Sequence, residues 1–139
     1  MDYKNNKGFT LIEMMVVIAV IGILSAAVLA GIAPGRQKAR ETRIINAVKQ
    51  VQVLVESMIS DSGTYPGNVA VGAADGYVKA NKDARDNGAD GNINYAEEGS
   101  RYIISSRFQV SKNKWYCVDS LGAARSVVTA ISGFECPAS

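Results

Sequence analysis

Histidine is absent from this 139-residue chain, and cysteine (two) and proline (three) are scarce. Without histidine, the chain lacks the commonest general base and the commonest transition-metal ligand of proteins. A hydrolase triad and a histidine-based zinc site are therefore excluded. A strong excess of either charge is missing too, because 15 Lys and Arg against 13 Asp and Glu leave a net charge of +2. This balance argues against a nucleic-acid-binding surface built on bulk electrostatics, and the length fits one modest domain.

Charged residues are missing altogether from residues 14–33, a run of 20 residues. As a helix, this run would rise about 30 Å, which is the thickness of the hydrocarbon core of a bilayer. It follows a short polar leader that contains Lys4 and Lys7. Three interpretations compete: a cleaved secretory signal with small residues at 25–27, an uncleaved single-pass anchor, or a more specialised segment.

Glu13, at the start of the apolar run, fits neither of the first two interpretations well. A carboxylate within a membrane segment costs about 2.5–3.5 kcal/mol and indicates a function or a partner, unless it lies near enough to the membrane surface to stay hydrated. A cut after Gly8 would give Phe9 a positively charged amine, four residues before Glu13 on the same helical face. The amine and the carboxylate could then pair, within one chain or between neighbouring helices.

The stretch KGFTLIE, residues 7–13, resembles the processing signal of type IV pilins and of the related pseudopilins of type II secretion. The short leader and Phe9 are similar to those of the type IVa branch. This resemblance, which is strong over residues 1–33, implies that a membrane-embedded prepilin peptidase cuts between Gly8 and Phe9 and methylates the new amine of Phe9. It also implies that Glu13 neutralises the terminal amine of an adjacent subunit during assembly.

These features predict three parts: a leader (1–8), a hydrophobic transmembrane and assembly helix (9–33) and an exported globular domain (34–139). Four basic residues follow the apolar run: Arg36, Lys38, Arg40 and Arg43. The positive-inside rule alone would leave the orientation open or keep the domain in the cytoplasm. The processing motif and the cysteines favour export.

Beyond the apolar run, the pattern predicts an amphipathic helix over residues 36–60. Its apolar residues recur at helical spacing: Ile44, Val48, Val51, Val55 and Met58. We expect a long helix from Phe9 to about residue 62, kinked at Pro34 and ended by a left-handed glycine cap within residues 61–67. A long helix of this kind resembles that of pilins.

The C-terminal part is predicted to form a small antiparallel sheet. Three stretches have strand character, at 101–110, 114–119 and 126–131, and residues 67–100 are expected to be a connecting loop. The predicted fold class is α+β: a long N-terminal helix packed on a small sheet, in a roll like that of the pilins.

Cys117 and Cys136 are predicted to form a disulfide, since an even number of cysteines in an exported domain usually pairs. In the chain-entropy model, such a crosslink stabilises the fold by about 3 kcal/mol. The alternative is two buried thiols. Pilins resemble the first case, because a C-terminal disulfide commonly bounds their receptor-facing or variable region, whereas major pseudopilins often lack it.

Residues 86–97 nearly fit the twelve-residue calcium loop of EF-hands. Five residues would supply oxygen ligands: Asp86, Asp90, Asn92, Asn94 and Glu97. Gly88 stands where one ligand is expected, and no flanking pair of helices is visible. A solvated turn is therefore favoured over a calcium site. Apart from this candidate calcium, no cofactor is expected.

The leading hypothesis is a structural subunit of a type IV pilus, and the alternative is a pseudopilin of a type II secretion system. An enzyme on an anchor has little support, because no nucleophile–base pair can be assembled. The partners implied are further copies in a helical filament, the prepilin peptidase, the assembly machinery and the inner membrane before assembly, with an extracellular fibre afterwards. Adhesion or twitching motility would belong to that fibre. No specific nucleic acid is expected.

Overall fold

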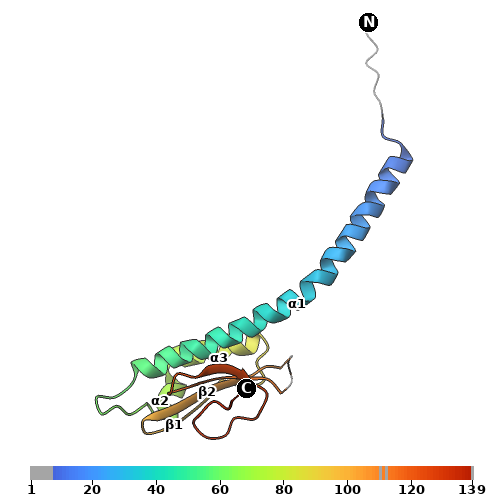
Figure 1. Ribbon diagram of the computed structural model, residues 1–139. Coiled ribbons are helices and arrows are strands. Elements are labelled where there is room, and N and C mark those ends of the chain that lie inside the picture. Colours follow the sequence, from blue (N-terminus) through green and yellow to red (C-terminus); the bar gives the residue numbers. More distant parts are fainter. Residues whose placement is uncertain (1–7, 110, 112, 139) are drawn as a thin grey trace. The chain divides into compact units, whose positions relative to one another are not determined.

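The computed structural model describes residues 8–109, 111 and 113–138, and the chain divides into two units after Arg36. The predicted leader residues 1–7 lie outside the described residues. The elements, in chain order, are helices α1 (Leu11–Ser57), α2 (Asn68–Ala73) and α3 (Asp75–Asp86), followed by strands β1 (Asn94–Glu98), β2 (Arg101–Arg107), β3 (Trp115–Asp119) and β4 (Ala124–Val127) (Figure 1).

The N-terminal unit contains the first part of α1, whose large apolar side chains are exposed on every side. Phe9 is 81% exposed, and Ile23, about four helical turns further on, is 71% exposed. By length and composition α1 is able to cross a membrane, with a mean hydropathy of 2.8 over its most apolar window. Pro34 lies inside α1, so the helix does not end there. Proline removes only one backbone donor, and the flanking turns keep theirs.

The globular unit is built on a four-stranded antiparallel meander in the order β1-β2-β3-β4. In the central pair, Ile104 lies opposite Val118, and Ile103 lies opposite Asp119. The α+β class is thus confirmed, but the sheet has one strand more than predicted. β1 comes from the stretch expected to be a loop, and β2 and β4 both end earlier than predicted.

The core lies between one face of the sheet and the predicted apolar stripe of α1. From the helix, the stripe buries Ile44, Ala47, Val48, Val51 and Val55. From the sheet, the same core contains Tyr102, Ile104, Phe108, Tyr116 and Val118. Met58, the last residue of the predicted stripe, is outside α1 and outside the buried set. The amphipathic prediction therefore holds over the helix as far as Val55.

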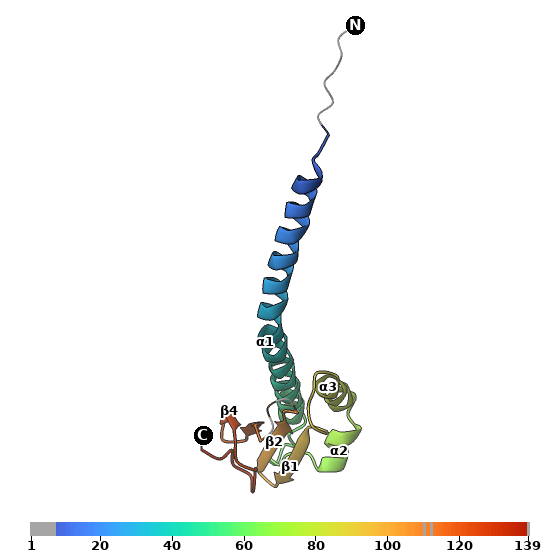
Figure 2. The same cartoon turned by 90° about the vertical axis from the view of Figure 1, so that its right-hand side faces the viewer.

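Two helices replace most of the loop predicted for residues 67–100. Val71 of α2 and Ala80 and Ala84 of α3 are buried in the same core as the α1 stripe. Figure 2 shows these helices at the β1 side of the sheet, opposite β4 and the C-terminus. A Cβ at Gly76 would lie 3.5 Å from the Leu54 side chain, an ordinary van der Waals distance, so α3 lies next to α1 at this point.

The glycine expected to cap α1 has another role. Gly63 has a positive φ of 75°, but it lies six residues beyond the last helical residue, Ser57. Its N–H donates to the carbonyl of Ser60 at 2.9 Å, which closes a separate turn. The helix ends earlier because Ser57 and Ser60 offer hydroxyls that compete with the helical hydrogen bonds, as in the 2.6 Å bond from Ser57 Oγ to the carbonyl of Leu54.

Candidate functional site

Glu13 and Thr10 form a capping box at the start of α1. The backbone N–H of Thr10 donates to Glu13 Oε2 at 2.7 Å, and the Thr10 hydroxyl donates to the same oxygen at 2.8 Å. In return, the backbone N–H of Glu13 donates to Thr10 Oγ1 at 3.3 Å. Thr10 is thus the N-cap and Glu13 the third helical residue, which satisfies backbone donors that the first turn leaves without partners.

This arrangement holds the carboxylate of Glu13 in one position without using all its acceptor capacity. Both bonds from Thr10 reach Oε2, and among the described residues no donor reaches Oε1. A carboxylate can accept up to about four hydrogen bonds. The outer oxygen therefore has room for a cation such as an ammonium group.

Glu13 also lines a shallow groove on the helix surface. The groove has a volume of about 390 Å³, and its other lining residues are all apolar: Phe9, Ile12, Val16 and Val17. Such a surface, with one fixed anionic group among apolar side chains, is complementary to an apolar segment that carries one positive charge. The predicted processing residues Gly8 and Phe9 are exposed and precede α1, which begins at Leu11.

Thr10 was missing from the residues predicted from the sequence to take part in assembly. The pattern that would have found it is present, since Thr10 and Glu13 have the spacing of a capping box before an apolar run. The spacing of Glu13 from Thr10 thus predicts the start of the helix in addition to a charge in the apolar segment.

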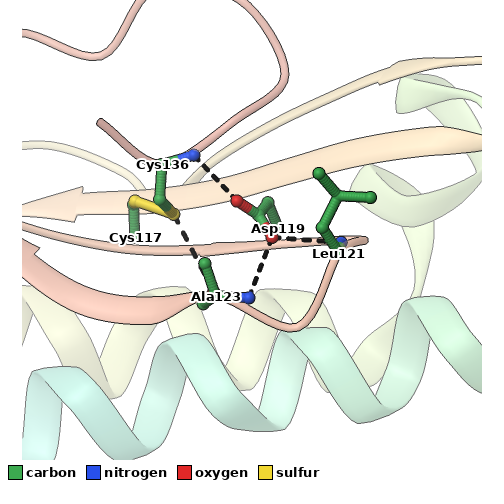
Figure 3. Close-up of a disulfide and its surroundings, with 5 residues drawn as sticks. All are labelled: Cys117, Asp119, Leu121, Ala123 and Cys136. Atoms are coloured by element: carbon green, nitrogen blue, oxygen red, sulfur yellow. Dashed lines mark hydrogen bonds between the residues drawn. A yellow bond between two sulfur atoms is a disulfide. The ribbon is translucent and has the colours of Figure 1, made fainter. Parts of the chain in front are cut away.

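The predicted disulfide between Cys117 and Cys136 is present (Figure 3). The two Cα atoms are 5.9 Å apart and the residues are 19 positions apart in the sequence. Both cysteines are buried together with Ile103, on the face of the sheet opposite to α1. The bond therefore fixes the C-terminal segment to the far side of the sheet.

Three of the five candidate calcium ligands are bonded to basic side chains of the protein. Asp86 ends α3 and pairs with Lys82 at 2.6 Å, which raises the pKa of Lys82. Asp90 pairs with Arg107 at 3.1 Å, and the side-chain oxygen of Asn92 accepts a bond from Arg85.

The last two candidates, Asn94 and Glu97, belong to β1. Within the described ranges, no group of three or more His, Cys, Asp or Glu residues could hold a metal ion. Calcium binding stays a prediction that this arrangement disfavours, because cations of the protein already occupy three of the ligands. A fall in the melting temperature on adding a chelator would establish it.

Polar side chains also tie α1 to the rest of the globular unit. The Tyr102 hydroxyl donates to Glu56 Oε1 at 2.8 Å, and burial raises the pKa of Tyr102. The Ser111 hydroxyl donates to Glu41 Oε1 at 2.7 Å, and this bond is the main reason why the pKa of Glu41 lies below its ordinary value. These contacts are structural ties, and they bring no nucleophile next to a base.

Comparisons with known proteins agree with this geometry. Residues 3–29 match the family described as the prokaryotic N-terminal methylation motif. A fimbrial protein of Neisseria meningitidis serogroup B is 31% identical to this chain, over 89% of the chain and 82% of the relative. The type IV major pilin protein PilE of Neisseria gonorrhoeae is 30% identical, over 80% of the chain and 73% of the relative.

A shorter match links the chain to the type IV wide pilus major component PilA4 of Thermus thermophilus, at 34% identity over 48% of this chain and 51% of the relative. No solved structure matches the chain significantly. The methylation motif, the apolar start of α1 and the similarity to pilins over 80–89% of the chain agree, and the chain belongs to the type IV pilin family.

Proposed function

We propose that this chain is the precursor of a type IV pilus subunit, which is cut between Gly8 and Phe9, methylated at the Phe9 amine and polymerised through residues 9–33. In this proposal residues 1–8 are the leader, and residues 34–139 are the exported domain. The observation that carries it is the carboxylate of Glu13, held by Thr10 in an apolar groove four residues after the new terminus.

The exposed apolar surface of α1 supports polymerisation. Side chains such as those of Leu11, Ile23 and Leu29 are 69–77% exposed. Surface of this kind is stable only in lipid or against other apolar helices. We infer that the inner membrane covers it before assembly, and that copies of the same helix cover it in an extracellular fibre.

Charge pairing would set the register of these helices. After cleavage, the Phe9 ammonium is a cation in an apolar environment, and Glu13 is the anion nearest to it in the sequence. A helix packed out of register would leave both charges unpaired, at a cost of about 3–5 kcal/mol for a buried pair. The pairing thus favours one alignment of neighbouring subunits over others.

The remaining partners follow from the same proposal. Cleavage and methylation require a prepilin peptidase, and extraction from the membrane requires an assembly machinery. The names of the relatives describe structural subunits of pili, and we infer that this chain likewise has no enzymatic activity. The alternative, a pseudopilin, is less well supported, because the Cys117–Cys136 disulfide, which major pseudopilins often lack, is present.

The experiment that tests the proposal is mass spectrometry of protein sheared from the cell surface. A chain that begins at methylated Phe9 in this fraction is the expected result. Processed protein found only in membranes would favour a pseudopilin, and a chain that begins at Met1 would contradict the proposal.

A variant at the cleavage site sharpens this experiment. Gly8→Ser should leave an uncleaved membrane protein, because a side chain now stands where the peptidase must approach the backbone. Gly72→Ser, at an exposed helical glycine with open space around it, is the matched control and should be processed normally. Normal fibres from Gly8→Ser would show that the processing site lies elsewhere.

A further inference from the structure

Asp119, the last residue of β3, is a buried carboxylate with an unusual set of partners. Only 2% of its surface is exposed. Oδ1 accepts the backbone N–H groups of Leu121 and Ala123, both at 3.0 Å, and Oδ2 accepts the N–H of Cys136 at 2.8 Å (Figure 3). Among the described residues it takes part in no ion pair. Its charge is therefore stabilised by three peptide N–H groups.

These three donors come from two separate parts of the chain. Leu121 and Ala123 belong to the turn between β3 and β4, whereas Cys136 follows Asp119 by 17 residues. One oxygen thus organises the turn, and the other reaches the C-terminal segment, residues 128–138. If that segment left the sheet, the buried carboxylate would lose one of three donors, and such a loss is costly for a charged group.

The disulfide joins the same two parts of the chain, β3 and the C-terminal segment. Cys117 and Asp119 are two positions apart on β3, so their side chains lie on the same face of the sheet. Both reach Cys136, the first through sulfur and the second through the backbone N–H. Cys136 is therefore held twice, once covalently and once by a charge-assisted hydrogen bond.

Other contacts of the C-terminal segment come from side chains. Ile131 and Phe134 pack on the cluster of Ile103, Cys117 and Cys136, and the Arg101 guanidinium lies 5.6 Å from the centre of the Phe134 ring. Among the backbone hydrogen bonds described outside helices and strands, none involves residues 128–138. Asp119 is thus the group that bonds to the backbone of this segment.

We propose that Asp119 is a second, non-covalent latch, which keeps residues 128–138 on the sheet whether or not the Cys117–Cys136 disulfide is present. The latch requires two acceptor oxygens, because one serves the turn and the other serves Cys136. A carboxylate supplies both, whereas an amide of the same shape supplies one acceptor and turns a donor toward the second N–H. The C-terminal segment is therefore held on the sheet by the charged carboxylate of Asp119 as well as by the Cys117–Cys136 disulfide.

Hydrogen exchange of the full chain in detergent, followed by mass spectrometry of the peptide that covers residues 128–138, tests this inference. The variant C117S/C136S lacks the disulfide and keeps the Cys136 backbone N–H. The N–H at position 136 is the amide of this peptide that donates to Asp119, and we expect it to exchange about 10- to 100-fold more slowly than in C117S/C136S/D119N. Asp61→Asn, a change of the same kind at an exposed position, should leave the exchange rate unaltered in the same background.

A second variant separates the latch from the turn. In C117S/C136P the proline removes the N–H at position 136, while the bonds of Asp119 to Leu121 and Ala123 remain. Chymotrypsin should cut after Phe134 in this variant as fast as in C117S/C136S/D119N, and exchange protection of the β2 and β3 amides should report an intact sheet. If chymotrypsin cuts C117S/C136S itself as fast as these two variants, Asp119 does not hold the segment and the inference is wrong.

Discussion

The two units of this protein use the same helix, α1, in opposite ways. Before Arg36, the helix is apolar on all sides, and Leu11 and Ile23 are more than two-thirds exposed. After Gln37 it is amphipathic, and Val48 and Val51 have no exposed surface. The first part must find its partners outside the chain, whereas the second finds them within it. Folding of the globular unit therefore depends on the second stretch of the helix, whereas the proposed assembly depends on the first.

The acidic residues show the same contrast. Glu13 is held by its own helix and keeps one oxygen toward the outside. Glu41 accepts a bond from Ser111, 70 positions away, so its charge is used to fix the fold. A change at Glu13 should therefore affect the proposed assembly, whereas a change at Glu41 should affect the stability of the fold.

The largest effect is expected from Glu13→Ala, which should reduce the amount of fibre about 100-fold, because the Phe9 ammonium would stay unpaired among apolar helices. Thermal unfolding of the globular unit should not change. Glu135→Ala, at an exposed glutamate, is the control and should assemble normally. Quantification of sheared fibre and a melting curve check both points, and wild-type amounts of fibre would refute the pairing.

Val48→Ala tests the role of the second part of α1 in the stability of the globular unit. It removes two methyl groups from a fully buried position, and the free energy of unfolding should fall by about 2 kcal/mol. Val53→Ala, on the same helix but 66% exposed, should change it by less than about 0.5 kcal/mol. Urea unfolding followed by the fluorescence of Trp115, the single tryptophan, measures both. Equal effects of the two variants would contradict the assignment of the buried face.

Thr10→Val removes the hydroxyl of the capping box and keeps the size of the side chain. A lost N-cap costs about 1 kcal/mol, so the amount of fibre should fall roughly five-fold if the fixed carboxylate is what assembly requires. Thr10→Ser restores the hydroxyl and should assemble like the wild type. A normal yield from Thr10→Val would mean that Glu13 pairs without help from Thr10.

The smallest effect concerns the pH dependence of stability. The pKa of Glu41 is lowered in the folded protein, first by the bond from Ser111, so its contribution is present above the ordinary value of 4.5 and is lost as the pH falls below it. Glu41→Gln should flatten this part of the stability profile by about 0.3 kcal/mol, since the group is near the surface. Urea midpoints measured from about pH 6 to about pH 3 check this, and identical profiles would show that the bond contributes nothing.

Periodicity predicted α1 correctly, because large aliphatic residues such as Ile44 and Val48 mark its buried face. It failed for α3, whose buried residues are Ala80, Asn81 and Ala84. Small and polar residues carry little periodic signal, so apolar spacing does not reveal the buried face of α3. β1 was missed for a similar reason, since only Tyr95 in it is large and apolar.

The sequence by itself determined the processing motif, the apolar run and the position of Glu13 relative to Phe9, because these depend on residues within one or two helical turns. It also limited the disulfide to one pair. Only the tertiary structure decided that Asp119 bonds to Cys136, and that Asp86 ends α3 whereas Glu97 lies in β1. Contacts between distant residues depend on how the sheet, the helices and the C-terminal segment pack, and local patterns do not encode that packing.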